Sequence, residues 1–135
     1  MKFLSEEWFK ATEQRVYAAF TKPGKYSLDF CEVYENCPGE NSTLWMLFHI
    51  EKGIVKNITR GVGQPAKHEY MGIADYKDHV RCCKGQLDPK KAVISGVFKL
   101  EDNASDGGPM KTLALINMYM KLTEAKRVPG LEFDE

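Results

Sequence analysis

The sequence predicts an α+β fold in which a sheet is covered by helices, and three observations support this. Segments of strand length alternate or run apolar in the first half of the chain, at residues 26–34, 43–51 and 54–59. Lys52-Gly53 stands between the last two of them, which is typical of a hairpin. Capped helical patterns stand before and after the strands, so that helices and strands are segregated along the chain.

The chain begins with a helical pattern. Ser5 is a good N-cap, and Glu6 and Glu7 place negative charge where the helix dipole favours it. An amphipathic face follows, formed by Leu4, Trp8, Ala11, Ala18 and Phe20, with Val16 and Tyr17 nearby. The turn Lys22-Pro23-Gly24 ends the helix. We expect its apolar face to pack on the sheet.

The predicted strands differ in whether one or both of their faces must be buried. Residues 26–34 alternate between apolar and polar side chains, which predicts a half-buried strand. Residues 43–51 are apolar on both faces and need cover on both. Helices can cover one face, and a partner protomer, a second helix layer or a bound apolar ligand can cover the other. After the hairpin strand at 54–59, a weaker alternation predicts a fourth strand at residues 67–72.

The second half of the chain predicts two short helices, one strand and a last helix. Asp75 caps a helix that carries apolar residues at helical spacing. Asp88 caps another, for which Pro89 suits the first position, and Ser95-Gly96 ends it after one or two turns. Residues 97–101 then alternate as a strand. A polar turn cluster leads into an apolar helix from Met110 to Leu122.

Composition limits the class of protein. A chain of 135 residues predicts a single domain, residues 1–135. The 19 Lys and Arg residues balance 19 Asp and Glu residues, so we expect no nucleic-acid partner. The longest apolar run, residues 44–48, is too short to span a bilayer. Four cysteines without a secretory signal predict a reduced, cytoplasmic protein.

The sequence offers few groups with catalytic or metal-binding potential. His79 and Cys83 are four residues apart on a predicted helix and could share a metal with Cys82 or His68. No second His or Cys pair at metal spacing accompanies them, so we predict no metal and no cofactor. No nucleophile motif is present, and Gly61-x-Gly63 lacks the helix that a dinucleotide loop needs. We therefore expect no enzymatic activity.

Several short motifs resemble the sterol carrier protein 2 (SCP-2) family. They are Gly85-x-Leu87-Asp88-Pro89-x-x-Ala92 and Ser95-Gly96-x-Phe98-Lys99-Leu100, together with an N-terminal segment, Met1 to Trp8, that looks like the first helix of small prokaryotic members. In order and spacing the resemblance covers nearly the whole chain. It implies a five-stranded, mainly antiparallel sheet with helices packed on one face.

The last helix is the main argument for function. Its apolar residues surround most of the helix between positions 113 and 122, which requires extensive cover. From the residues alone, a plain core or dimer helix explains this as well as a ligand site does. The resemblance favours the ligand site, because in the SCP-2 family the C-terminal helix closes an apolar tunnel between sheet and helices in which lipid tails lie.

We therefore predict a lipid-binding or lipid-carrier protein that holds a fatty acyl, phospholipid or isoprenoid tail non-covalently. The predicted wall residues are Trp45, Leu47, Phe98, Leu113, Ile116 and Met120. Lys90 and Lys91 are predicted to meet an anionic head group, and transient membrane contact would accompany loading. The alternative is a protein-interaction or homodimerisation module, or an accessory factor of a lipid or quinone pathway enzyme. A small enzyme acting on a lipid is a third, weaker alternative.

Overall fold

The computed structural model describes residues 1–102 and 109–134, which form a five-stranded sheet and four helices. In chain order the elements are α1 (Glu6–Ala19), β1 (Leu28–Glu35), β2 (Leu44–Glu51), β3 (Ile54–Val62), β4 (Tyr70–Asp75), α2 (Tyr76–Cys83), α3 (Pro89–Ser95), β5 (Lys99–Asp102) and α4 (Pro109–Lys126). The predicted α+β class is confirmed.

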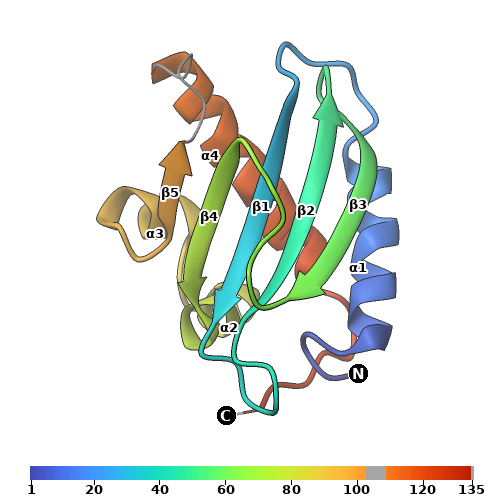
Figure 1. Ribbon diagram of the computed structural model, residues 1–135, viewed down its shortest axis with the longest axis vertical. Coiled ribbons are helices and arrows are strands. Elements are labelled where there is room, and N and C mark those ends of the chain that lie inside the picture. The colour runs from blue at the N-terminus through green and yellow to red at the C-terminus, as the bar shows by residue number, and fades with distance from the viewer. Residues whose placement is uncertain (103–108, 135) are drawn as a thin grey trace.

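The sheet has the strand order β3-β2-β1-β4-β5. β1 pairs antiparallel with β2, β2 with β3, and β4 with β5, whereas β1 and β4 are parallel. The sheet is therefore mainly antiparallel, as predicted. The parallel pair requires the chain to cross from β3 to the far side of β1, and this connection, residues 63–69, runs over the front of the sheet in Figure 1.

The helices cover the other face of the sheet, with α1 and α4 behind it in Figure 1. The register assigns even-numbered residues of β1 to the helix face, since Phe30 contacts Tyr119 of α4 at a ring distance of 6.2 Å. Tyr34, further along the same face, contacts Trp8 of α1 at 6.5 Å. The core therefore lies between the sheet and these two helices.

The predicted N-caps are all present. The Ser5 hydroxyl accepts a hydrogen bond from the Trp8 amide at 3.2 Å. The carboxylate of Asp75 accepts one from the Lys77 amide, and that of Asp88 accepts one from the Lys91 amide. α3 ends at Gly96, which has a φ of 83° in the left-handed region that favours glycine. The capping residues therefore determine where these helices begin, and they can be recognised from the sequence alone.

Two strand predictions need correction. β1 was expected to be half-buried, but Cys31 and Val33, on the face away from the helices, are 0% and 1% exposed. β1 is the central strand, and the connection over residues 63–69 adds cover to its second face (Figure 1). The fourth strand begins at Tyr70 rather than at residue 67, because pairing with β1 begins at Tyr70 opposite Phe30. Before it, the Glu69 carboxylate accepts a hydrogen bond from the Asp29 amide at 3.0 Å.

The last helix is longer than predicted. α4 continues past Leu122 to Lys126, and this extra turn carries Thr123 and Lys126, both buried. The polar cluster predicted before the helix falls mostly on residues 103–108, outside the described residues. None of the helices in the described part of the chain combines the length and hydrophobicity that a bilayer crossing requires.

Candidate functional site

A groove opens between the sheet and α4 at the end of the sheet where β1 begins, and we call it the α4 groove. It has a volume of about 350 Å³. Its lining consists of Phe20, Lys22, Pro23, Gly24, Lys25, Tyr26, Leu28, Ile50, Gly53, Ala114, Asn117, Met118 and Lys121. The buried side chains of Leu28, Ile50 and Met118 make its floor apolar. Such a floor can hold a hydrocarbon group by removing it from water.

Three lysines stand around this apolar floor. Lys22 and Lys25 flank the turn after α1, and Lys121 projects from α4. The Lys121 ammonium lies over the Phe20 ring, 4.9 Å from its centroid, which is a cation–π contact. No carboxylate belongs to the described lining. The groove therefore combines an apolar floor with a cationic rim, which suits an amphiphile with an anionic end.

A close contact between Gly24 and Gly53 holds one edge of the α4 groove in place. The Gly24 amide donates to the Lys52 carbonyl at 2.7 Å, and the Gly53 amide donates to the Tyr26 carbonyl at 3.0 Å. A Cβ on Gly53 would lie 2.6 Å from the Gly24 nitrogen, and Gly53 has a φ of +80°. Only glycine satisfies both conditions. The turn after α1 and the β2–β3 hairpin are thereby joined into one edge of the groove.

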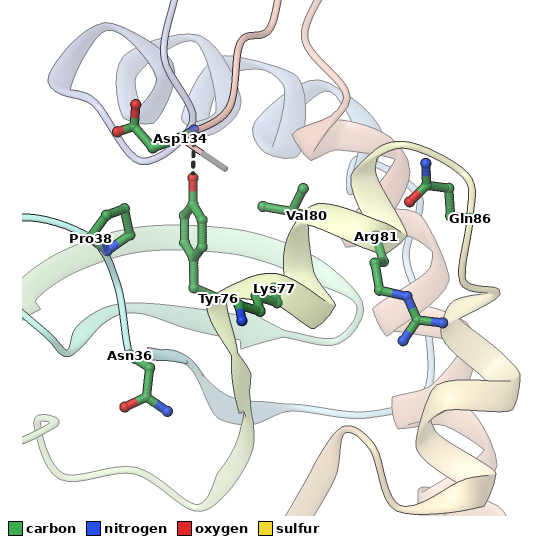
Figure 2. Close-up of a pocket in the computed structure, with 8 residues that line it drawn as sticks. All are labelled: Asn36, Pro38, Tyr76, Lys77, Val80, Arg81, Gln86 and Asp134. Atoms are coloured by element: carbon green, nitrogen blue, oxygen red, sulfur yellow. Dashed lines mark hydrogen bonds between the residues drawn. The ribbon is translucent and has the colours of Figure 1, made fainter.

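A second groove, the α2 groove, lies at the opposite end of the sheet and has a volume of about 370 Å³. Figure 2 shows its lining, which comprises Asn36, Pro38, Tyr76, Lys77, Val80, Arg81, Gln86 and Asp134. The Tyr76 hydroxyl accepts a hydrogen bond from the Asp134 amide at 3.1 Å.

The charges around the α2 groove are mixed. Arg81 pairs with Asp78 at 3.2 Å, and Asn36 donates to the Asp75 carboxylate, whose pKa this contact holds below its usual value. Lysine and arginine side chains therefore stand beside carboxylates here. The α2 groove therefore lacks the uniform cationic rim of the α4 groove. Its mixed charges favour neither an anionic nor a cationic ligand.

Between the two grooves the core contains a buried ion pair. Glu32 of β1 and Lys126 of α4 are 0% and 2% exposed, and their charged atoms are 2.8 Å apart. The Tyr34 hydroxyl donates to the other Glu32 oxygen. Burial raises the pKa of Glu32, but Lys126 and these hydrogen bonds outweigh burial, so the pKa lies below its usual value. Glu32 is therefore ionised at neutral pH and joins β1 to the last turn of α4.

His79 completes this polar centre. Its Nε2 donates to the Val33 carbonyl at 3.0 Å, and its ring packs on Tyr34 and Phe98 at 4.3 Å and 4.8 Å. Burial, followed by the Lys126 charge, lowers the pKa of His79 to about 3. The imidazole is therefore neutral at physiological pH, and its other nitrogen, Nδ1, is buried without a hydrogen-bond partner among the described residues.

The structure does not bring the six predicted wall residues together. Trp45 and Leu47 are half-buried on the face of β2 that points away from the helices, where Trp45 covers Gly61 of β3. Phe98 is fully buried in the core against Tyr119. The sequence could not separate the faces of β2, because both are apolar.

The α4 residues of that prediction also point in different directions. Leu113 and Met120 are 47% and 40% exposed, and Ile116 is half-buried. The expected cover of α4 is present at Leu115, Met118, Tyr119 and Leu122, but it does not extend to this outward face. Met118, which sequence reasoning did not select, faces the sheet and lines the α4 groove.

The predicted head-group lysines lie elsewhere. Lys90 and Lys91 are exposed on α3 and do not line the α4 groove. Its lysines are Lys22, Lys25 and Lys121, which sequence reasoning missed. Two of them flank the Pro23-Gly24 turn, and this basic turn is the feature of the sequence from which they could have been predicted.

The cysteines do not form an activated nucleophile. All four are free and buried. Burial raises the pKa of Cys31 to about 12, and those of Cys37 and Cys82 to about 11, and it also raises that of Cys83. They are thiols at neutral pH. In the part of the chain that the structure describes, no three His, Cys, Asp or Glu side chains are placed to hold a metal.

Solved structures with the same architecture exist. A crystal structure of sterol carrier protein 2 has a TM-score of 0.67 and 15% identity, and the match covers 91% of this chain and 95% of that one. The solution structure of a conserved hypothetical protein from Thermus thermophilus has a TM-score of 0.61 and 20% identity, covering 91% and 86% of the two chains.

A third similar structure is the solution structure of a palmitated SCP-2-like 2 protein from Aedes aegypti, with a TM-score of 0.51 and 15% identity. The match covers 82% of this chain and 92% of that one. No protein-family model and no curated protein sequence matches the chain. The matching structures agree with the five-stranded sheet and its helices, and this chain therefore has the sterol carrier protein 2 fold.

Proposed function

We propose that this protein is a lipid carrier that holds the apolar tail of an amphiphile non-covalently in the α4 groove. The observation that supports the proposal is the apolar floor of Leu28, Ile50 and Met118 beneath a rim of three lysines. Proteins of this fold include one solved in a palmitated form. Each methylene that leaves water contributes about 0.8 kcal/mol before ordering costs.

The ligand class is a fatty acyl, phospholipid or isoprenoid tail with an anionic end. Lys22, Lys25 and Lys121 supply the positive charge at the groove, in place of the predicted Lys90 and Lys91. The proposal treats residues 1–135 as one domain with a carrier rather than a catalytic role. A cytoplasmic location and transient membrane contact during loading belong to the same proposal.

Two methionines on opposite sides of α4 provide the test. Met118 lines the α4 groove, whereas Met120 is exposed on the outer face and belongs to the wall predicted from sequence. We expect Met118→Gln to weaken the binding of a fluorescent fatty-acid probe about tenfold, and Met120→Gln to leave it unchanged. Thermal unfolding of both variants shows whether each is folded at the assay temperature.

The opposite result has a clear meaning. If Met120→Gln weakens probe binding and Met118→Gln does not, the ligand lies against the wall predicted from sequence and the α4 groove is not its site. If neither the wild type nor any variant binds the probe, and native mass spectrometry of gently purified protein shows no bound lipid, the carrier function itself is wrong.

A protein-interaction module is the second candidate. Leu113 and Met120 are seven residues apart on α4, so they share its outer face, and both are exposed. This apolar pair could contact a second copy of the chain or a partner enzyme. Light scattering of the wild type and of Leu113→Gln/Met120→Gln tests this function. A dimer that dissociates in the double variant would favour it over the carrier function.

A further inference from the structure

The α4 groove ends against a wall of aromatic rings. Leu28 and Ile50 line the groove, and Phe30 and Phe48 lie two residues further along β1 and β2, about 7 Å deeper. Phe30 stacks on Phe48 at 6.5 Å and meets Tyr119 of α4 edge-on at 6.2 Å. These three rings are 0%, 1% and 1% exposed. They close the space between sheet and helix immediately behind the floor of the groove.

The buried ion pair stands behind this wall. Glu32 follows Phe30 on the same face of β1, and Lys126 is one turn beyond Leu122 on α4. A tail that passed the rings along the strands would have to separate Glu32 from Lys126 and place hydrocarbon against both charges. An ion without its partner in the protein interior is strongly unfavourable. Behind the three rings, the ion pair is therefore a second barrier to a tail that extends along the strands.

The dimensions of the groove set the length of tail that it can cover. Its lining on α4 extends from Ala114 to Lys121, which is about 10 Å of helix. An extended chain advances about 1.2 Å for each backbone bond, so this distance corresponds to roughly eight or nine bonds. We propose that the wall of Phe30, Phe48 and Tyr119 limits the length of tail that the α4 groove can cover to about ten carbons. This inference rests on the proposed carrier function.

A chain-length series tests the inference. Saturated fatty acids from octanoate to hexadecanoate are used, below their critical micelle concentrations, to displace a fluorescent fatty-acid probe from the wild-type protein. We expect affinity to rise about fourfold for each methylene up to decanoate, because each is buried. From dodecanoate to hexadecanoate we expect no further gain, because the added methylenes stay in water.

A matched pair of variants tests the wall itself. Phe30→Ala removes the ring that joins Phe48 to Tyr119 in the wall, whereas Phe98→Ala removes an equally buried ring that contacts Tyr119 on the side of His79. We expect Phe30→Ala to move the plateau to longer chains and to bind tetradecanoate at least tenfold more tightly than the wild type. Phe98→Ala keeps the wild-type profile. Phe30→Leu provides a milder opening if Phe30→Ala does not fold.

The results distinguish a failure of the chain-length limit from a failure of the carrier function. If the wild type binds the series but affinity keeps rising fourfold per methylene up to hexadecanoate, the wall does not limit the tail and this inference is wrong while the carrier function stands. If the wild type shows the plateau but neither Phe30 variant moves it, the rings are not its cause and the inference is again overturned. If no fatty acid of any length binds, the carrier function fails, and the chain-length limit fails with it.

Discussion

Glu32 is buried at a position where its residue type alone would predict exposure. A charged residue within an alternating strand ordinarily faces solvent, yet Glu32 is fully buried and paired with Lys126, 94 residues later in the chain. The Lys126 ammonium also contacts two aromatic rings. It lies 5.6 Å from the centroid of Tyr34 and 5.3 Å from that of Tyr119. A pair of this kind is stable only while both partners remain.

This gives a prediction for the pair. Glu32→Leu alone should destabilise the protein by about 3–5 kcal/mol, because Lys126 is then buried without a counter-charge. The double variant Glu32→Leu/Lys126→Met should lose much less than the sum of the two single variants. Urea denaturation of the four proteins measures the coupling. Additive losses would show that the two side chains do not stabilise each other.

At the level of elements, α4 is held at its C-terminal end by polar contacts. The Arg15 side chain of α1 donates to the carbonyls of Ala125, Glu124 and Arg127, the first at 2.8 Å. The Trp8 indole donates to the Lys126 carbonyl at 3.1 Å. These donors satisfy carbonyls that the end of a helix leaves unpaired. The middle of α4, which lines the groove, is held mainly by apolar packing.

Arg15→Met tests this anchor. We expect a loss of about 1.5–3 kcal/mol, the usual range for hydrogen bonds made by a charged group, because the carbonyls at the end of α4 lose their donor. Arg81→Met is the control, since Arg81 makes an exposed ion pair with Asp78 and should cost less than about 1 kcal/mol. Equal losses in the two variants, measured by urea denaturation, would show that Arg15 does not anchor the helix.

At the scale of the whole molecule, two buried groups make the fold sensitive to acid. The pKa of His79 falls from 6.5 to about 3 on folding, and that of Glu32 falls below 4.5. At these two groups the unfolded chain therefore binds more protons than the folded one below about pH 6.5. The stability that these groups contribute is present above their unfolded pKa values. It is lost as the pH falls, first through His79 and then also through Glu32.

His79→Gln tests the first of these contributions. Glutamine can still donate to the Val33 carbonyl but cannot take up a proton, so we expect stability to fall less steeply between about pH 6.5 and pH 4.5. His49→Gln is the control. The hydrogen bonds of His49 with Asp29 and Glu51 raise its pKa, so its contribution is lost at higher pH instead. A wild-type slope in His79→Gln, measured by urea denaturation at several pH values, would contradict the assignment.

The sequence by itself determined the fold class, the helix starts at Ser5, Asp75 and Asp88, and the end of α3 at Gly96. These features depend on contacts within one turn of helix, which a local reading of the chain contains. The resemblance of short motifs to the SCP-2 family added the mainly antiparallel five-stranded sheet, which the structure confirmed.

Only the tertiary structure decided which faces meet. β2 is apolar on both faces, and α4 is apolar around most of its circumference, so no periodicity shows that Met118 lines the groove while Trp45 and Met120 do not. The ion pair of Glu32 and Lys126 likewise requires β1 to lie against the last turn of α4. The physical reason is that burial depends on which surfaces pack together across the fold, whereas caps and turns depend on neighbours in the chain.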